Sequence, residues 1–95
     1  MKTYFVYVIT NYTKTTLYIG VTSDLVQRID QHKKGVVDGF SMKYNLKYLV
    51  YFEKTGDVSE AILREKQLKK WKREWKERLI NELNPKWRDL SDDWV

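Results

Sequence analysis

The sequence predicts a small α+β protein, with a three-stranded β-sheet flanked by helices in the order β-β-α-β-α-α. Three runs of aromatic and β-branched residues predict the strands, two near the N-terminus and one in the middle of the chain. Apolar residues recur at helical spacing after the second run and again after the third. The length of 95 residues suits a single domain over 1–95, with 86–95 as a short C-terminal tail.

The first two strands are expected to form a hairpin. The segment Tyr4 to Thr10 (YFVYVIT) is aromatic and β-branched throughout, which is typical of a central strand with two apolar faces. The short polar loop from Asn11 to Thr15 favours an antiparallel connection to a strand over Leu17 to Val21. In such a hairpin Tyr7 and Tyr18 can be near neighbours.

The stretch from Leu17 to His32 contains the second strand, a turn and the start of a helix. Gly20 has no Cβ, so a ligand or another part of the chain can approach the backbone there. Asp24 is a favourable N-cap, and Gln27 can complete a capping box, which predicts a helix from residue 25 to about 34. Arg28 and His32 stand four residues apart and therefore share a face of that helix.

The second half of the chain predicts a loop, a strand and helices. Lys34 to Asn45 contains two glycines and shows no periodicity, so we expect a long loop before a third strand at Leu46 to Glu53. Asp57 or Ser59 can cap the helix that is expected from Glu60 to about Lys70. The run from Lys69 to Glu77 fits either a kinked continuation of this helix or a second helix, and we prefer two helices.

The second of these helices is expected to end near Glu82. Asn84-Pro85 closes it, because proline disfavours helical backbone at the residue before it. The tail can then dock through Trp87, Leu90 or Trp94.

Composition excludes several kinds of site. The chain has no cysteine and one histidine, which excludes disulfides, thiolate metal sites and a histidine-rich zinc centre. A hard cation held by oxygen ligands stays compatible with the sequence. Apolar stretches fall well short of the ~20 residues that cross a bilayer, and no secretory leader pattern is present, so we expect a cytoplasmic protein without a membrane partner.

Positive charge is concentrated in one segment. Ala61 to Ile80 holds eight basic and three acidic residues and so carries the whole formal net charge of +5. Such a concentration is typical of a protein that binds the phosphate backbone of nucleic acid. A solvated helix face explains such a run about equally well.

Glu65 is a carboxylate on a helix face that should point inward, because it lies four residues after Ala61 and three before Leu68. An ion pair or a slightly rotated, exposed helix accounts for it in one interpretation. The other is a cation ligand, since Mg²⁺ is usually held by one or two carboxylates together with water and substrate phosphate.

Arg28 is the most suggestive of the remaining polar residues, because its guanidinium offers a rigid donor fork suited to phosphate. A surface salt bridge with Asp24 is the alternative. Tyr7 and Tyr18 are ordinary strand residues, and a tyrosine with a reference pKa of about 10 takes a proton at neutral pH only with help from a cation or metal-bound hydroxide. His32 is more often an orienting or surface residue than a ligand.

Together these residues resemble the GIY-YIG nuclease superfamily in order and in spacing. The resemblance is closest to its small stand-alone bacterial members of the YhbQ-like or UPF0213 type, and it covers nearly the whole chain. It lies in the stretches FVYVIT, LYIGVTSDLVQRIDQHKKG, GFSMKYN, KYLVYFE and REKQLKKWKREWK. Membership implies a small three-stranded sheet between helices, in agreement with the order above.

The resemblance also implies a role for each site residue. Glu65 would hold a single Mg²⁺ or Mn²⁺ on the leaving-group side of a phosphodiester, and Arg28 would stabilise the charge that develops on the phosphate oxygens. Tyr7 and Tyr18 would orient or deprotonate the attacking water, in an order that the sequence leaves open, with His32 supporting one phenol.

Two features depart from the family pattern. The first motif reads Phe5-Val6-Tyr7, so it keeps the tyrosine but lacks the glycine and isoleucine. The supporting asparagine of many members has two candidate matches, Asn81 and Asn84.

The expected function is a metal-dependent endonuclease acting on nucleic acid, with DNA preferred, as in DNA repair or recombination. We expect backbone contacts from the helices between Arg64 and Arg78 and from the loop between Lys33 and Lys47. The chosen contact residues are Lys33, Lys34, Lys43, Lys69, Lys70, Lys72 and Arg73.

Two alternatives belong to other classes of function. The same fold can act as a weak or inactive nucleic-acid-binding module or adaptor. Trp71, Trp75 and Trp87 can form a protein-protein surface, although tryptophan at helical spacing is usually part of a core. Family members are often fused to targeting domains, so without one the activity is expected to be weak, selective for substrate structure, or dependent on a protein partner that supplies targeting.

Overall fold

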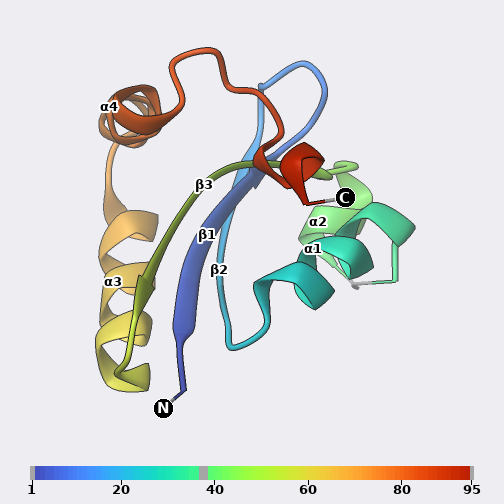
Figure 1. Cartoon of the computed structure of the whole chain (residues 1–95). Helices are drawn as coiled ribbons and strands as arrows, with labels where there is room; N and C mark the ends of the chain where they lie inside the picture. The colour runs from blue at the N-terminus through green and yellow to red at the C-terminus, as the bar shows by residue number, and fades with distance from the viewer. Residues whose placement is uncertain (1, 37–38, 95) are drawn as a thin grey trace.

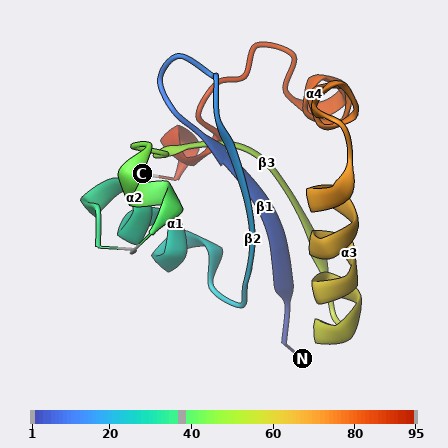
Figure 2. The ribbon, with the colours of Figure 1, turned by 180° about the vertical axis from the view of Figure 1, so that it is seen from behind.

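The structure, a computed structural model, describes residues 2–36 and 39–94. Its elements in chain order are β1 (Tyr4–Thr10), β2 (Leu17–Thr22), α1 (Leu25–Lys34), α2 (Phe40–Lys43), β3 (Tyr48–Thr55), α3 (Val58–Lys70), α4 (Arg73–Leu83) and the 3₁₀ helix η1 (Leu90–Asp93). The three strands form one antiparallel sheet in the order β2-β1-β3, so β2 and β3 are its edges. Figures 1 and 2, which view the sheet along its plane from opposite sides, show α1, α2 and η1 on one face and α3 and α4 on the other.

The predicted fold class and the N-terminal hairpin are confirmed. β1 pairs with β2 so that Tyr7 lies opposite Gly20 and Ile9 lies opposite Tyr18. Because side chains alternate between the faces of a strand, Tyr7 and Tyr18 point to the same face, with ring centroids 6.4 Å apart. The first helix also begins and ends where its cap and periodicity predict.

The core consists of two apolar layers, one on each face of the sheet. Under α1 the layer joins Tyr7 and Ile9 of β1 to Leu25 and Ile29 of the helix. Under α3 and α4 the strand residues are joined by inward positions of both helices, namely Ala61, Leu68 and Ile80. Alternation along β1 therefore sends odd-numbered side chains to the α1 face and even-numbered ones to the α3 face.

The loop expected between residues 34 and 45 contains a short helix that the periodicity did not indicate. The backbone N–H of Lys43 donates to the carbonyl of Gly39 at 3.0 Å, and that of Leu46 donates to the carbonyl of Ser41 at 2.9 Å. The buried side chain of Leu46 fixes the end of this turn in the core. Part of the predicted loop, residues 37 and 38, lies outside the described residues.

The later boundaries shift by two residues, and the two-helix prediction is confirmed. β3 begins at Tyr48 and continues to Thr55, because its last residues still pair with the start of β1. The Asp57 side chain caps α3 by accepting from the backbone N–H of Ser59 at 2.7 Å, so the helix begins at Val58. In the described chain no helix has the length and apolar character to cross a membrane.

The C-terminal tail docks through all three residues suggested for it. Leu90 packs against the layer under α1, and Trp94 lies edge-on to Phe52 with ring centroids 6.5 Å apart. Trp87 packs against the layer under α3 and α4. Trp71 packs there too, whereas Trp75 is 45% exposed, so the three-tryptophan surface is only partly available.

Candidate active site

The phenol of Tyr7 lies over Gly20 of the neighbouring strand. A Cβ at Gly20 would fall 2.5 Å from the Tyr7 hydroxyl oxygen, a separation that side chains cannot adopt without displacing the ring. The absence of a side chain at this position therefore allows a residue of the central strand to bring its hydroxyl to the β2 edge. The side chain of Tyr7 is completely buried.

Helix α1 places His32 against this phenol. Leu25 and Ile29 bury the face of the helix that carries His32, and the imidazole itself is only 3% exposed. Its Nε2 lies 3.1 Å from the Tyr7 hydroxyl, and its Nδ1 lies 3.0 Å from Oγ of Ser41 in α2. Three elements thus contribute to one buried chain of hydrogen bonds.

Tyr18 completes the aromatic group on the open side. Its ring centroid lies 6.4 Å from that of Tyr7 and 5.9 Å from that of His32. Unlike Tyr7, Tyr18 is partly exposed, because it lies on the edge strand. Tyr7, Tyr18 and His32 therefore form a compact cluster that opens at the β2 edge.

The positive charge of Arg28 lies beside this cluster and influences the pKa of His32 and of Tyr7. Burial, and then the Arg28 charge, lower the pKa of His32 to about 4, so the imidazole is neutral at pH 7. Burial, the nearby Tyr18 and the Glu65 carboxylate raise the pKa of Tyr7 to about 12, although Arg28 opposes the rise through its charge and hydrogen bonding. Tyr7 is therefore a protonated phenol at neutral pH.

No carboxylate of the described residues forms an ion pair with Arg28. The Asp24 side chain, its expected alternative partner, instead caps α1 by accepting from the backbone N–H of Gln27 at 3.1 Å. Apart from its hydrogen bond to Tyr7, the guanidinium thus has donors available beside the cluster, as binding of an anionic group requires.

Glu65 approaches the same cluster from the opposite face of the sheet. It belongs to α3, its side chain is 21% exposed, and its charge contributes to the raised pKa of Tyr7. Its one ion-pair partner among the described residues is Lys69, with Nζ 3.6 Å from Oε1. Lys69 Nζ also lies 5.9 Å from the centre of the Tyr18 ring, which ties this pair to the cluster.

The donor set suits a hard cation with few protein ligands. Groups of three or more His, Asp or Glu residues that could hold a metal do not occur in the described part of the chain. Glu65 therefore offers one carboxylate, partly open to solvent, beside the aromatic cluster. Mg²⁺ suits such a place, since it retains several waters and takes substrate phosphate as a further ligand.

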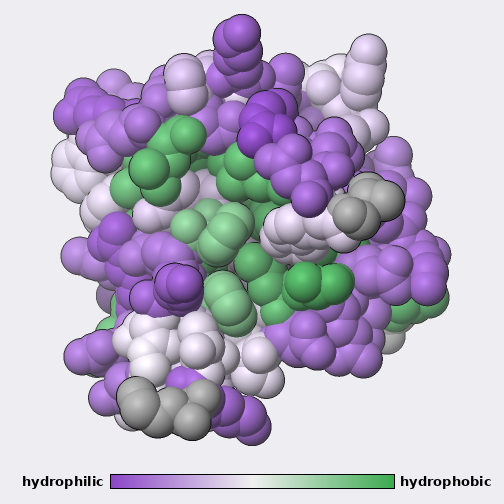
Figure 3. All heavy atoms as spheres, in the orientation of Figure 1, coloured by the Kyte–Doolittle hydropathy of each residue, from purple (hydrophilic) through white to green (hydrophobic). Residues whose placement is uncertain are grey.

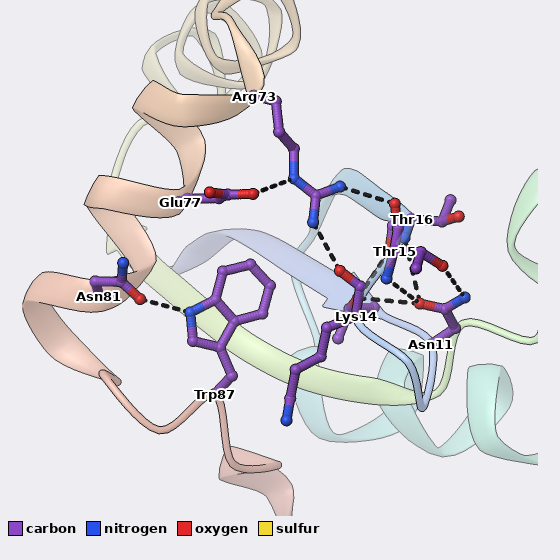
Figure 4. A network of polar contacts seen from close by, with 9 residues as sticks. Asn11, Lys14, Thr15, Thr16, Arg73, Glu77, Asn81 and Trp87 are labelled. Atoms are coloured by element: carbon purple, nitrogen blue, oxygen red, sulfur yellow. Dashed lines mark hydrogen bonds and ion pairs between the residues drawn. The ribbon is translucent and has the colours of Figure 1, made fainter.

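Two of the basic residues expected to contact nucleic acid are occupied by other parts of the protein. Lys33 forms a salt bridge with the buried Asp89 carboxylate of the tail. Arg73 donates to Oε2 of Glu77 at 2.8 Å and to the carbonyls of Lys14 and Thr15 at 2.7 and 2.9 Å (Figure 4). These two cations hold the fold together, so we do not assign them to a ligand.

The other five basic residues lie at the surface. Lys34 pairs with Asp30 on α1, and the Lys43 ammonium lies 5.5 Å from the centre of the Tyr44 ring. Lys69 lies in the site itself, whereas Lys70 and Lys72 are exposed where α3 gives way to α4. Only one of the five is therefore adjacent to the cluster.

Neither candidate asparagine lies in the cluster. Asn84 is buried, and its Nδ2 donates to the carbonyls of Val50 and Arg88 at 3.0 and 2.8 Å. Asn81 accepts from Nε1 of Trp87 at 2.6 Å. Both residues serve the junction between α4 and the tail.

Ser41 is a member of this hydrogen-bonded cluster that the sequence did not indicate. It is 4% exposed and holds the far nitrogen of His32. The one available signal was chemical: a histidine on a buried face needs a partner for its second ring nitrogen. The identity of that partner depends on the fold of α2.

Comparison with known proteins identifies the family of this chain. The model of the GIY-YIG catalytic domain matches residues 3–78. A UPF0213 protein of Staphylococcus aureus strain Mu3 is 33% identical over 82 residues, which cover 86% of this chain and 99% of that protein. A UPF0213 protein of Aeromonas salmonicida is 30% identical over 79 residues, which cover 83% of this chain but 57% of the relative.

The fold also matches a solved structure. The solution NMR structure of the UPF0213 protein BH0048 from Bacillus halodurans superposes with a TM-score of 0.58 at 22% identity, and the match covers 95% of each chain. The resemblance noted in the sequence is thereby confirmed. This chain belongs to the GIY-YIG family, among its small UPF0213 proteins.

Proposed function

We propose that this chain is an endonuclease that uses Mg²⁺ or Mn²⁺ to hydrolyse phosphodiester bonds in nucleic acid, with DNA as its substrate. The observation that carries the proposal is the meeting of Tyr7, Arg28 and Glu65, from three different elements, at the β2 edge of the sheet. Membership of the GIY-YIG family supports nuclease-type chemistry.

Arg28 binds the scissile phosphate in this proposal. Its guanidinium has no carboxylate partner within the described residues, and its fork of N–H donors matches two phosphate oxygens. Negative charge accumulates on those oxygens in the transition state, so a fixed cation stabilises the transition state more than the ground state.

Glu65 is the residue that would hold the divalent cation. When bound, the cation supplies Lewis-acid stabilisation of charge on the phosphate and on the leaving oxygen. Lys69 shares the carboxylate in the absence of a cation, and its partly exposed ammonium can move away toward the substrate backbone.

Tyr7 holds the attacking water. Its phenol proton is donated to Nε2 of His32, and its oxygen accepts from Arg28, which leaves one lone pair to accept a hydrogen bond from water. With Nε2 as acceptor, Nδ1 of the neutral imidazole carries the proton and donates it to Oγ of Ser41.

The same chain of bonds gives the proton a path. As the water oxygen bonds to phosphorus, the bond from phosphorus to the leaving oxygen breaks, and that oxygen takes a proton from solvent. The proton of the attacking water passes to the Tyr7 oxygen while the phenol proton passes to Nε2 of His32. The developing charge on the phosphate raises the proton affinity of the imidazole at that moment, and the proton later leaves to solvent. Tyr18 packs against both rings and keeps this relay in place.

Cleavage of single-stranded, branched and duplex DNA tests the proposal, with Mg²⁺, with Mn²⁺ and with EDTA. The Glu65→Gln and Arg28→Ala variants are each expected to lower the rate by about 10²–10³, because each removes one stabilising charge. EDTA is expected to abolish cleavage by the unchanged protein.

Glu53→Gln is the matched control. Glu53 is also a partly exposed carboxylate with a cationic partner, Arg64 at 2.9 Å, but it lies on β3. Its replacement is expected to leave the rate unchanged. Cleavage that survives both site variants would disprove the assignment, and salt-sensitive binding without cleavage of any substrate would favour a binding module instead.

A further inference from the structure

Two hollows follow the β2 edge away from the candidate site. The first, of about 310 Å³, is lined by Leu17, Tyr18, Ile19, Lys69 and Lys76. Because Tyr18 belongs to the aromatic cluster, this hollow opens directly beside the site. A chain bound at the cluster can therefore continue along β2.

The second hollow, of about 380 Å³, lies beyond the first, where the hairpin tip meets α4. Its lining includes Lys14 of the hairpin, Lys86 and Trp87 of the tail, and Arg73 and Glu77 of α4. Figure 4 shows the Lys14 side chain extending alongside the Trp87 indole. Lys14 and Trp87 both have positive φ, 61° and 52°, so the two rims of this hollow hold uncommon backbone conformations.

Arg73 lines the second hollow and stands three residues before Lys76 of the first, on the same face of α4. Its guanidinium bonds to the carbonyls of Lys14 and Thr15 and to Glu77, and it lies 6.0 Å from the centre of the Trp87 ring (Figure 4). These contacts fix the hairpin tip against α4. The wall of the second hollow is thus fixed by contacts within the protein, and we refer to the two hollows along the β2 edge together as the path.

The lysines along this path are free to bind an anion. The ammonium groups of Lys14, Lys76 and Lys86 form no ion pair within 2–36 and 39–94. The pKa of Lys76 is lowered by burial and by the Arg73 charge, as expected of a cation that lacks a counter-charge. Arg73 and Glu77 neutralise one another, so the unbalanced charge comes from lysine.

We propose that the nucleic-acid strand flanking the scissile phosphate runs along the β2 edge to the hairpin tip. Lys76 contacts a phosphate next to the site, and Lys14 and Lys86 contact phosphates further along. The identity of the strand rests on the proposed endonuclease function. Lysines act on phosphates as point charges and carry no sequence information, so this binding does not depend on base sequence.

Binding of a fluorescent single-stranded DNA of about 20 nucleotides tests the path by anisotropy, with EDTA present and salt varied from about 50 to 200 mM. Lys76→Gln is expected to weaken binding roughly fourfold near 0.15 M salt, and the Lys14→Gln/Lys86→Gln pair to weaken it further. Each lost contact should reduce the salt slope by about 0.7.

Lys54→Gln is the control, because Lys54 is an exposed lysine of β3 beside a different hollow. It makes the same change in net charge and is expected to leave affinity and slope unchanged. Equal losses in all variants, or no loss in the path variants, would overturn the inference. The Trp87 indole N–H signal offers a second measurement on the unaltered protein: a shift on adding DNA supports the path, and no shift with saturating DNA contradicts it.

The two proposals fail separately in these measurements. Path variants that bind normally while the protein cleaves DNA would remove the path and keep the endonuclease. DNA that binds through Lys76, Lys14 and Lys86 but is never cleaved would keep the path and remove the endonuclease.

Discussion

The two edges of the sheet differ in how their charges are used. At the β3 edge lies a hollow of about 510 Å³ in which the carboxylate of Glu53 and the guanidinium of Arg64 bind each other at 2.9 Å. At the β2 edge, Arg28 and Lys76 have no such partner within the described residues. Figure 3 faces the β3 edge and shows hydrophobic residues gathered between hydrophilic rims.

The difference shows that the size of a hollow does not identify the site. The β3 hollow is the larger, but its Glu53 and Arg64 bind each other, and the hydroxyl of Tyr51 donates to the same carboxylate at 3.2 Å. The β2 edge has smaller hollows, a neutral imidazole and a protonated phenol, all beside unpaired cations. Chemistry needs groups that are available to a substrate, and for this reason we propose the site at β2.

The largest effect is expected when Gly20, at the β2 edge, gains a side chain. In Gly20→Ala the new Cβ would meet the Tyr7 hydroxyl at 2.5 Å, so the phenol must move. We expect roughly a hundredfold loss of cleavage rate, since a shift of about 1 Å in a reacting group has that effect, and a loss of about 1–3 kcal/mol in the free energy of unfolding. Cleavage kinetics and urea unfolding measure both.

Gly56→Ala is its counterpart after β3. A Cβ there would have its nearest neighbour, the carbonyl oxygen of Lys2, at 4.0 Å, which is ordinary contact. That variant is expected to keep both rate and stability. Equal effects of the two substitutions would show that Gly20 has no special relation to Tyr7.

Acid is expected to destabilise the α1 face through His32. The pKa of His32 is about 4 in the folded protein, because of burial and the Arg28 charge, and 6.5 is its ordinary value. The unfolded chain therefore binds more protons between these values, and stability falls as pH is lowered through this window, by about 2 kcal/mol between pH 7 and pH 4.5. Urea unfolding at several pH values measures the loss.

His32→Gln should flatten this dependence, since no other histidine is present in the chain. Asp89 does not interfere: although burial opposes it, bonding to Lys33 and Ser91 holds the pKa of its carboxyl below 3.8, so its contribution is lost only at lower pH. An unchanged slope in His32→Gln would mean that the imidazole is not the group that titrates.

Removal of the Ser41 hydroxyl is expected to have a smaller effect, on the free energy of unfolding and on the tautomer of His32. Ser41→Ala leaves Nδ1 of His32 without its partner in a buried place, at a cost of about 1–3 kcal/mol in stability. The NMR signals of the single histidine report its tautomer directly, and we expect a mixture of tautomers in place of one.

Ser41→Thr keeps the hydroxyl and should restore the single tautomer. If Ser41→Ala leaves both the tautomer and the cleavage rate unchanged, then the serine does not position His32. A loss of stability alone, with the tautomer intact, would point to packing.

The sequence was most informative about elements that depend on interactions between residues close together in the chain. Periodicity and caps placed β1, α1 and the break between α3 and α4, because these depend on residues within a few positions of one another. It also singled out Glu65, a charge on an inward helix face, and Gly20, a place of close approach. The group that approaches Gly20, the Tyr7 phenol, comes from another strand.

The features that the sequence did not indicate all depend on distant partners. Lys33 meets Asp89 across 56 positions, and Arg73 meets the hairpin carbonyls across 58 and 59, so their apparent availability in the sequence was misleading. Ser41 joins the site because Leu46 anchors the turn around α2 in the core. Local patterns carry no information on such pairs, which only the tertiary fold decides.

The smallest expected effect is at the β3 edge. Glu53→Gln removes an ion pair with Arg64 in which both side chains are about one-third exposed, 33% and 29%, so solvent screens much of its energy. We expect a loss of less than about 1 kcal/mol in urea unfolding, smaller at high salt, because screening already weakens the pair there. Arg64 also stacks on Trp71 at 5.3 Å, a contact that the variant leaves in place and that limits the loss further. A drop of several kcal/mol would contradict this expectation, since solvent would then screen the Glu53–Arg64 pair far less than its exposure implies.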